Sequence, residues 1–450
     1  MKLKVFFAQD GDCLLLTSAD GHHVLVDGGR TSSFETQTQP VLQDLANEGT
    51  PLDLVVVSHI DADHISGIIS LLQDVAAWVV HDFQVGDGKN PTFPEPTRPR
   101  PPTINGLWHN SWRAQLGDLA GPISALATQV SEAMELAPDS AAESTGAART
   151  AVESIADLAE SITGGIQLMR LVDDQTPVAR NAGFENRLVR LRDPVHRERV
   201  GTTTLTVLGP TEEHLEKLRD EWRQWLQRLL GPGRPIRPRG GGDRLGSADG
   251  QRLSLDDLQL ASGPSSVEDA EALIASIGTA AEIIEKTKSA TVTPPNRASI
   301  TLLAEEDGKT CLLTGDAAEE ELLEGLTAAG RLAEGRPFRC NLVKVQHHGS
   351  ENNLSKNFAD RVLADHYVFC ADGAHGNPNP SVIATIIESR LKAPGRFTIW
   401  FNCSENRTIT TRRKALRAAI QEAQEAASQH PNLIDVKVLD DQQSFFDVQL

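Results

Sequence analysis

Short apolar segments alternate with segments of helical periodicity in two stretches of the chain, residues 1 to about 85 and residues 289–450. The apolar segments are rich in Val, Ile and Leu and end in polar turns, as in HVLVDGG, DLVVVSH and KTCLLTGD, which is typical of buried strands. Strands that alternate with helices favour sheets covered by helices. Because both stretches share this plan, we expect two similar halves of one α/β domain.

The stretch between them, residues 86–288, has a different composition. It opens with a Pro-rich connector, NPTFPEPTRPRPP, which cannot hold regular structure. Residues 120–172 are rich in Ala, Ser and Glu with helical periodicity, residues 212–230 form an amphipathic helical pattern, and residues 266–288 are again helical in pattern. Only TTTLTVLGP, residues 202–210, has the pattern of a strand. We therefore expect a mostly helical insertion from which one strand returns to the core.

The charge and the cysteines indicate the class of protein. A net charge of -19 weighs against a sequence-independent nucleic-acid coat, whose surface is usually basic. The five cysteines form no CxxC pair and lie mostly in apolar runs, as buried thiols of a reducing compartment do. No apolar run approaches the length of a membrane span, and the N-terminus resembles a first strand rather than a secretory signal. We expect a cytoplasmic protein without a membrane partner.

The segment SHIDADH carries four metal-binding side chains in six residues, directly after a buried strand; they are His59, Asp61, Asp63 and His64. One such residue alone would be unremarkable in a polar loop. Imidazole and carboxylate groups at this density suit Zn²⁺, Mn²⁺ or Fe. The segment therefore predicts part of a metal site.

Other predicted strands also end in ligand-type residues. Asp316 follows TCLLTG, where it could equally be the N-cap of the next helix. His347 and His348 end the apolar segment LVKVQ, which favours metal or substrate binding. Asp27 in VLVDGG is more typical of a residue that orients a ligand, or of a turn, than of a ligand itself.

Together these motifs resemble the metallo-β-lactamase superfamily, and within it the nuclease-like domain of ComEC-type DNA-uptake proteins and their stand-alone relatives. That group has the motif SHxDxDHxxG, which spans Ser58–Gly67 here, and an Asn-x-x-Ser segment, which is Asn296–Ser299 here. LLTGD, HHGS and the opening FFAQDGDCLLL complete the resemblance, which covers residues 1–85 and 289–402.

The resemblance implies an αββα sandwich with two divalent metal ions, Zn or Mn, and the second site is expected to be the weaker one. His59 and Asp61 would hold one ion, and Asp63 and His64 the other. Asp316 would bridge both ions, and His347 would complete the second site. Because Asp61 replaces the histidine of the commoner motif, the first site is rich in oxygen and favours Mn²⁺ or a mixed pair.

Two departures from the superfamily's pattern stand out. In HGNPNP, Asn377 occupies the place of a histidine and is more suited to substrate than to a metal. The third ligand of the first ion has no obvious counterpart. His81, at the end of the apparent strand WVVHDF, and His109 in LWHNSW are candidates, although each is more often a structural histidine.

These residues predict a hydrolase that uses a metal-activated hydroxide. Asp63 would orient the hydroxide, while His348, Ser350 and Asn296 would donate hydrogen bonds to a leaving group or phosphate. By analogy the substrate is a phosphodiester: DNA, RNA or a nucleotide. Two basic segments, residues 186–200 and 231–244, suit phosphate contacts or are simply solvated loops.

Two other classes of function stay open. A hydrolase of a small ester, lactone or amide would need a narrow pocket roofed by the insertion. A protein with a weakened metal site could instead use the insertion to bind a protein partner or a second copy of itself. Trp108 and Trp112 either stack a substrate ring or anchor the insertion to the core.

Overall fold

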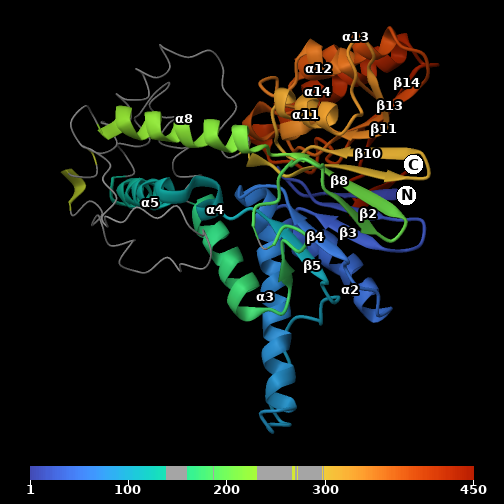
Figure 1. The fold of residues 1–450 in the computed structure, drawn as a ribbon. Helices are drawn as coiled ribbons and strands as arrows, with labels where there is room; N and C mark the ends of the chain where they lie inside the picture. Colours follow the sequence, from blue (N-terminus) through green and yellow to red (C-terminus); the bar gives the residue numbers. More distant parts are fainter. Residues whose placement is uncertain (138–159, 186, 231–265, 269–270, 272–295, 297) are drawn as a thin grey trace.

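Two β-sheets pack face to face between two layers of helices in the computed structural model (Figure 1). The structure describes residues 1–137, 160–185, 187–230, 266–268, 271, 296 and 298–450. The predicted αββα sandwich is confirmed. The basic loop expected at residues 231–244 and most of the helix expected at residues 266–288 lie outside the described residues.

The first sheet has seven strands in the order β15-β1-β2-β3-β4-β5-β6. Their bounds are β1 Lys2–Phe6, β2 Leu14–Thr17, β3 His23–Val26, β4 Leu54–Val57, β5 Gly106–His109, β6 Ala179–Arg180 and β15 Phe445–Gln449. The strands from β3 to β6 run parallel. The carboxyl ends of β4 and β5 therefore lie at the same edge, where polar loops can meet.

The second sheet has eight strands in the order β14-β13-β12-β11-β10-β9-β8-β7. Their bounds are β7 Arg197–Val200, β8 Thr203–Gly209, β9 Thr301–Glu306, β10 Lys309–Leu313, β11 Phe338–Lys344, β12 Val362–Phe369, β13 Phe397–Phe401 and β14 Ile434–Val438. The strands from β10 to β14 run parallel. The turns that follow β10 and β11 are thus neighbours.

Each sheet is apolar on both faces, because one face meets the other sheet and the other meets helices. On β4, Leu54 and Val56 pack between the sheets, whereas Val55 and Val57 pack toward the outer helices. The helices outside the first sheet are α1 Thr31–Ser33, the π-helix η1 Phe34–Thr38, α2 Gln39–Asn47 and α3 Ala62–Val85. Those outside the second are α11 Glu319–Ala328, α12 Lys356–Arg361, α13 Pro380–Leu391 and α14 Thr410–Gln429.

The range 86–288 is more closely joined to the sandwich than the sequence predicts. Besides β8 it supplies β5 and β6 to the first sheet and β7 to the second. Its described helical segments are α4 Trp112–Leu116, η2 Gly117–Leu119, α5 Ala120–Leu136, residues 160–170, η3 Leu171–Gln175 and α8 Glu212–Leu230. The sequence indicated β8 but not β5, β6 and β7, because strands of two to four residues leave too short a pattern to detect.

The apparent strand WVVHDF was also predicted wrongly, since residues 62–85 form the single helix α3. A short apolar run does not by itself distinguish a strand from a helix. The far end of α3 projects from the body of the molecule (Figure 1), and there Val79, Val80 and Phe83 are exposed. Among the described helices, none is both long and apolar enough to cross a lipid bilayer.

Candidate metal centre

Three turns at the carboxyl ends of parallel strands bring the predicted ligands together. The turn after β4 carries SHIDADH and leads into α3, which begins at Ala62. The turn after β10 carries Asp316, and the 3-10 turn η5 Gln346–Gly349 follows β11. His347 and His348 both have positive φ, at 46° and 55°. This conformation is uncommon for side-chain-bearing residues, and such strained residues cluster at functional sites.

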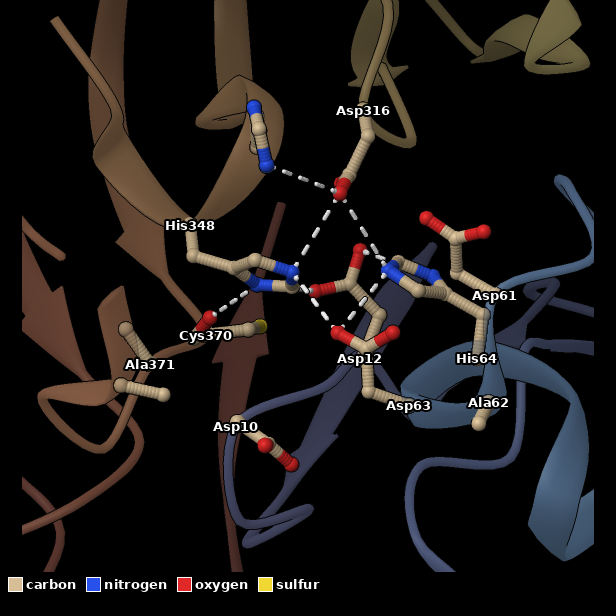
Figure 2. A network of polar contacts seen from close by, with 12 residues as sticks. Asp10, Asp12, Asp61, Ala62, Asp63, His64, Asp316, His348, Cys370 and Ala371 are labelled. Atoms are coloured by element: carbon tan, nitrogen blue, oxygen red, sulfur yellow. Dashed lines mark hydrogen bonds and ion pairs between the residues drawn. The ribbon is translucent and has the colours of Figure 1, made fainter. Parts of the chain in front are cut away.

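One carboxylate oxygen, Oδ2 of Asp316, lies among the Nε2 atoms of four histidines. The distances are 3.3 Å to His348, 3.5 Å to His64, 3.8 Å to His59 and 3.8 Å to His347. In Figure 2, Asp316 points between His348 and His64, and dashed lines join it to both rings. The structure thus brings together all of the histidines that the sequence predicts as primary ligands around the predicted bridging carboxylate.

Two more carboxylates complete this group. Asp61 Oδ2 lies 3.5 Å from His59 Nε2. Asp63 Oδ2 lies 3.6 Å from His64 Nε2 and 3.1 Å from His348 Nε2. The arrangement therefore has one side built on His59 and Asp61, and another built on Asp63, His64 and His348, with Asp316 between them.

The buried atoms of this group fit a divalent cation. The Nε2 atoms of His59, His64 and His348 make no hydrogen bond with any described residue. Unpaired buried polar atoms are costly and rare. His59, His64 and Asp316 offer ligand atoms that all lie within 4.8 Å of one another, which suits ligands that each approach one ion to about 2.0–2.2 Å.

The opposite ring nitrogens explain why the Nε2 atoms face Asp316. The Nδ1 atom of His64 lies 2.9 Å from Asp27 Oδ2, and that of His348 lies 2.7 Å from the Cys370 carbonyl oxygen. The Nδ1 atom of His347 lies 2.7 Å from Asn353 Oδ1. Because these oxygens can only accept, each Nδ1 carries the proton and donates. In the neutral ring the Nε2 lone pair is then free to bind a metal.

The charges of the group stabilise one another. Burial opposes ionisation of Asp316, but His348, His64 and the other nearby cations outweigh it and hold its pKa well below the usual range. Burial likewise opposes ionisation of Asp63, and His64 and His348 outweigh it, so its pKa is also lowered. Burial would lower the pKa of His348, yet Asp316 and the other carboxylates raise it to about 10. Metal uptake would therefore release protons from these rings.

The loops after β1 and β3 approach the start of α3 so closely that only glycine fits. A Cβ atom on Gly11 would lie 1.6 Å from the carbonyl oxygen of Asp63, and one on Gly28 would lie 2.5 Å from the backbone nitrogen of Ile68. The backbone of the first half thus packs directly on the first turns of α3, which fixes the position of Asp63.

Comparison with known proteins agrees with this geometry. Residues 8–82 match the metallo-beta-lactamase superfamily. The matched segment holds Asp27 and the whole SHIDADH turn. A search of the curated proteins found no match for the chain.

The superfamily match and the geometry together support a metal-dependent hydrolase with candidate metal-binding residues at Asp316 and the surrounding histidines. The matched segment ends before β9, so the ligands of the second half rest on the structure alone. Both nevertheless contact His64, which lies in the matched segment. Asp316 Oδ2 lies 3.5 Å from His64 Nε2, and the ring centroids of His348 and His64 lie 5.3 Å apart.

The structure places His347 and His348 differently from the sequence-based assignment. His348, rather than His347, lies beside Asp63 and His64. His347 Nε2 instead faces Asn296 Nδ2 at 3.2 Å, and the His347 side chain is 24% exposed. The sequence could not distinguish the two because the turn, with its two left-handed residues, decides which ring points inward.

Neither additional candidate ligand belongs to the groups of described residues whose ligand atoms lie within 4.8 Å of one another. His81 lies on α3 seventeen positions after His64, which is about 25 Å along a helix, and contacts Asp82 and Trp78. His109 ends β5 and is fully buried, and its ring makes no hydrogen bond with any part of the chain that the structure describes. Burial, followed by the charge of Arg180, lowers its pKa to about 3.

The remaining predicted residues lie around the turn η5 or in the core. Ser350 and Asn377 are buried, and the backbone of Asn379 bonds to Gly349 beside them. Trp108 is buried between the sheets, and Trp112 is buried among helices of the insertion in a cluster that also contains Ile60, so neither is an exposed stacking platform.

Three buried residues near the ligands were missed from the sequence. Asn353 holds His347 and donates to the Asp316 carbonyl oxygen at 3.0 Å. Asp12 and Lys344 form an ion pair, and both side chains are 1% exposed. A lysine inside the apolar strand LVKV, and a second aspartate in the opening QDGD, were the available signals.

Proposed function

We propose that this protein is a hydrolase with two divalent metal ions, one held by His59 and Asp61 and the other by Asp63, His64 and His348. Asp316 would contribute to both. The observation that carries the proposal is the convergence of four Nε2 atoms on one oxygen of Asp316, three of them without a hydrogen bond to any described residue. Asp61 makes the first side oxygen-rich, which favours Mn²⁺ or a mixed pair over two zinc ions.

When bound, the ions would supply Lewis acidity and a water of lowered pKa. The chain's own groups would orient the reactants. Asp63 lies at the opening of the group, with its side chain 17% exposed, where it can accept a hydrogen bond from a water. His347 is the most exposed of the four histidines, and with Asn296 it can bind a leaving group. In this proposal His347 takes the role that the sequence suggested for His348.

Phosphodiesters are the first substrate class that we propose. Paired divalent ions stabilise the attacking and leaving oxygens of a phosphoryl group. Ser350, Asn296 and Asn377 lie on or near the turn that carries His347 and would donate to the phosphate oxygens. This class also follows the resemblance of SHIDADHISG and HHGS to the ComEC-type nuclease-like domain.

A cavity against α3 supports a second class, small substrates, although none of the proposed metal ligands lines it. A cavity of about 700 Å³ runs along one face of α3, between α5 and residues 160–170, and begins at Thr31 and Ala62. Hydroxyl, amide and carboxylate groups, including Glu132, Glu135 and Glu160, line it together with Ile65 and Ile69, and no lysine or arginine is found among the described residues that line it. The carboxylates of this lining would repel a polyanion such as a nucleic acid, whereas a small uncharged substrate could enter the cavity.

Metal analysis and substrate comparison test the proposal together. Metal content is measured on the purified protein, and hydrolysis is then followed with Mn²⁺ on bis(p-nitrophenyl) phosphate, labelled single- and double-stranded DNA, a p-nitrophenyl ester and a lactone. Asp63→Ala should abolish the hydrolysis, whereas Asp82→Ala, on the exposed end of the same helix, should leave it unchanged.

The outcomes separate the functions. Cleavage of the phosphodiesters alone supports the first class, and cleavage of the ester or lactone alone supports the second. A folded protein with almost no metal, and no activity after Mn²⁺ is added, would refute both. The projecting end of α3, with its exposed Val80 and Phe83, would then favour a protein-binding role.

A further inference from the structure

Lys344 is a fully buried lysine at the end of β11, two residues before the turn that carries His347 and His348. Its Nζ atom pairs with Asp12 Oδ2 and donates to the Gly315 carbonyl oxygen at 3.1 Å. It also lies 3.5 Å from Asp316 Oδ1. The two oxygens of Asp316 are therefore divided: Oδ1 faces the ammonium, and Oδ2 faces the four imidazoles.

Asp12, the partner of Lys344, also approaches His348 and His64. Its Oδ1 atom lies 3.5 Å from His348 Nδ1, and its Oδ2 atom lies 3.9 Å from His64 Nδ1. These are the ring nitrogens that point away from Asp316, so Asp12 lies on the far side of the two rings from the proposed ions. Figure 2 shows Asp12 lying between His348 and His64. Asp12, His64 and His348 also offer ligand atoms that lie within 4.8 Å of one another, but the two ring nitrogens that Asp12 approaches already contact Asp27 and the Cys370 carbonyl oxygen. The contacts of Asp12 therefore suit the positioning of these rings.

The local charge requires a cation in this position. Five buried or half-buried aspartates surround the centre; they are Asp12, Asp27, Asp61, Asp63 and Asp316. Their ion pairs in the described structure involve four histidines and one lysine, Lys344. A carboxylate taken out of water without a nearby cation is strongly unfavourable.

We propose that Lys344 is an internal counter-cation of the metal centre. In the metal-free protein it holds Asp316 and Asp12 in place, and bound divalent ions take over the compensation of the negative charge. The proposal rests on the two-metal centre of the proposed function. Because the ammonium and the ions act on the same carboxylate, removal of the ammonium should make the chain bind metal more tightly while it destabilises the metal-free state.

Four variants and the wild type test this relation by Mn²⁺ titration calorimetry and by thermal melting with and without saturating Mn²⁺. Coulomb attraction predicts a change in Mn²⁺ affinity on the order of tenfold for each unit of charge. Lys344→Met should bind more tightly than the wild type and Asp12→Asn more weakly, and the double variant should bind like the wild type. The rise in Tm caused by Mn²⁺ should follow the same order.

Lys4→Met is the fourth variant and the matched control. Lys4 is also a largely buried lysine, but its partner is Asp447 of β15, at 3.0 Å, and not a residue of the metal centre. Its loss should lower the Tm equally with and without Mn²⁺. If Lys344→Met behaves in the same way, the pair of Lys344 with Asp12 is only structural and the proposal is overturned.

Two safeguards keep the test decisive. If Lys344→Met does not fold, the Mn²⁺ affinities of the other two variants decide. Asp12→Asn should bind more weakly than both the wild type and the double variant, and equal affinities in all three would overturn the proposal. Neither the Mn²⁺ titrations nor the thermal melts need a substrate. A protein that binds Mn²⁺ in the predicted order but hydrolyses nothing would therefore refute the hydrolase and leave this inference intact.

Discussion

Asp27 lies behind the proposed ligands and has both carboxylate oxygens engaged. Its Oδ1 atom accepts from the Ser58 backbone N–H at 2.7 Å, and its Oδ2 atom accepts from Ser58 Oγ at 2.7 Å and from His64 Nδ1 at 2.9 Å. The residue itself has positive φ, 58°, which suits a turn. The sequence left open whether Asp27 orients a ligand or forms a turn, and its contacts and backbone conformation are compatible with both roles.

Replacement of Asp27 by asparagine should weaken metal binding. The amide keeps the size of the side chain, but its NH₂ group cannot accept from His64, so the ring loses the contact that directs Nε2 toward Asp316. We expect a 10- to 100-fold loss of metal affinity and a fall in the free energy of unfolding of about 1–3 kcal/mol. A competition titration with a metal chelator measures the first, and urea unfolding the second.

Asp53→Asn is the control for this change. Asp53 also contacts an imidazole, that of His22 at 3.0 Å, and accepts from the backbone N–H of His23 at 2.9 Å. Equal losses of metal affinity in the two variants would show that the effect of Asp27 is general destabilisation rather than orientation of His64.

Helix α3 runs from the candidate metal centre to the outer surface, and its middle carries a buried carboxylate, Asp74. Asp74 is buried, accepts from Gln39 at 2.8 Å and lies 3.7 Å from Arg98. Burial raises its pKa to about 6, although Arg98 opposes the shift. The folded protein therefore holds this proton at pH values where the unfolded chain, with an ordinary carboxyl pKa of about 3.9, has lost it.

Asp74→Asn should stabilise the protein at pH 8 but not at pH 4. A raised folded-state pKa contributes stability below the unfolded pKa and loses it as the pH rises through about 6. Asparagine mimics the protonated form, so the free energy of unfolding should increase by about 1–3 kcal/mol at pH 8. Urea unfolding at both pH values measures the difference.

Asp82→Asn on the same helix should behave in the opposite way. The hydrogen bond from Arg100 lowers the pKa of Asp82 to about 2, and its side chain is 51% exposed. Its replacement should thus cost a little stability at pH 8. A stabilisation at pH 8 shared by both variants would show that loss of overall negative charge, not burial of Asp74, is the cause.

At the scale of the whole molecule, the sequence predicted the strand ends better than the strands. SHIDADH, Asp316 and the HH pair could be placed together from their resemblance to the metallo-β-lactamase superfamily, although β4 belongs to the first sheet and β10 and β11 belong to the second. The pairing of Asp12 with Lys344 could not be predicted, since it joins the two sheets and no local pattern records it. β5 and β6 were missed for a related reason: partner strands, not their own composition, define them.

The same packing determines the behaviour of the thiols. All five cysteines are buried in the apolar layers between the sheets or outside them, and burial raises the pKa of Cys13 and of Cys403 to about 12. A thiol reagent reacts with the thiolate, and it must also reach the sulfur. Both conditions fail in the folded sandwich, so the native protein should be inert to such reagents at pH 8.

Titration with 5,5′-dithiobis(2-nitrobenzoic acid) measures this directly. We expect no rapidly reacting thiol in the native protein and five after addition of guanidinium chloride. The rate of reaction without denaturant should then report how often the two sheets open. Because Cys370 supplies the carbonyl that holds His348, metal binding should slow this opening and protect the thiols further. Rapid modification of any thiol in the folded, metal-loaded protein would contradict the sandwich packing described above.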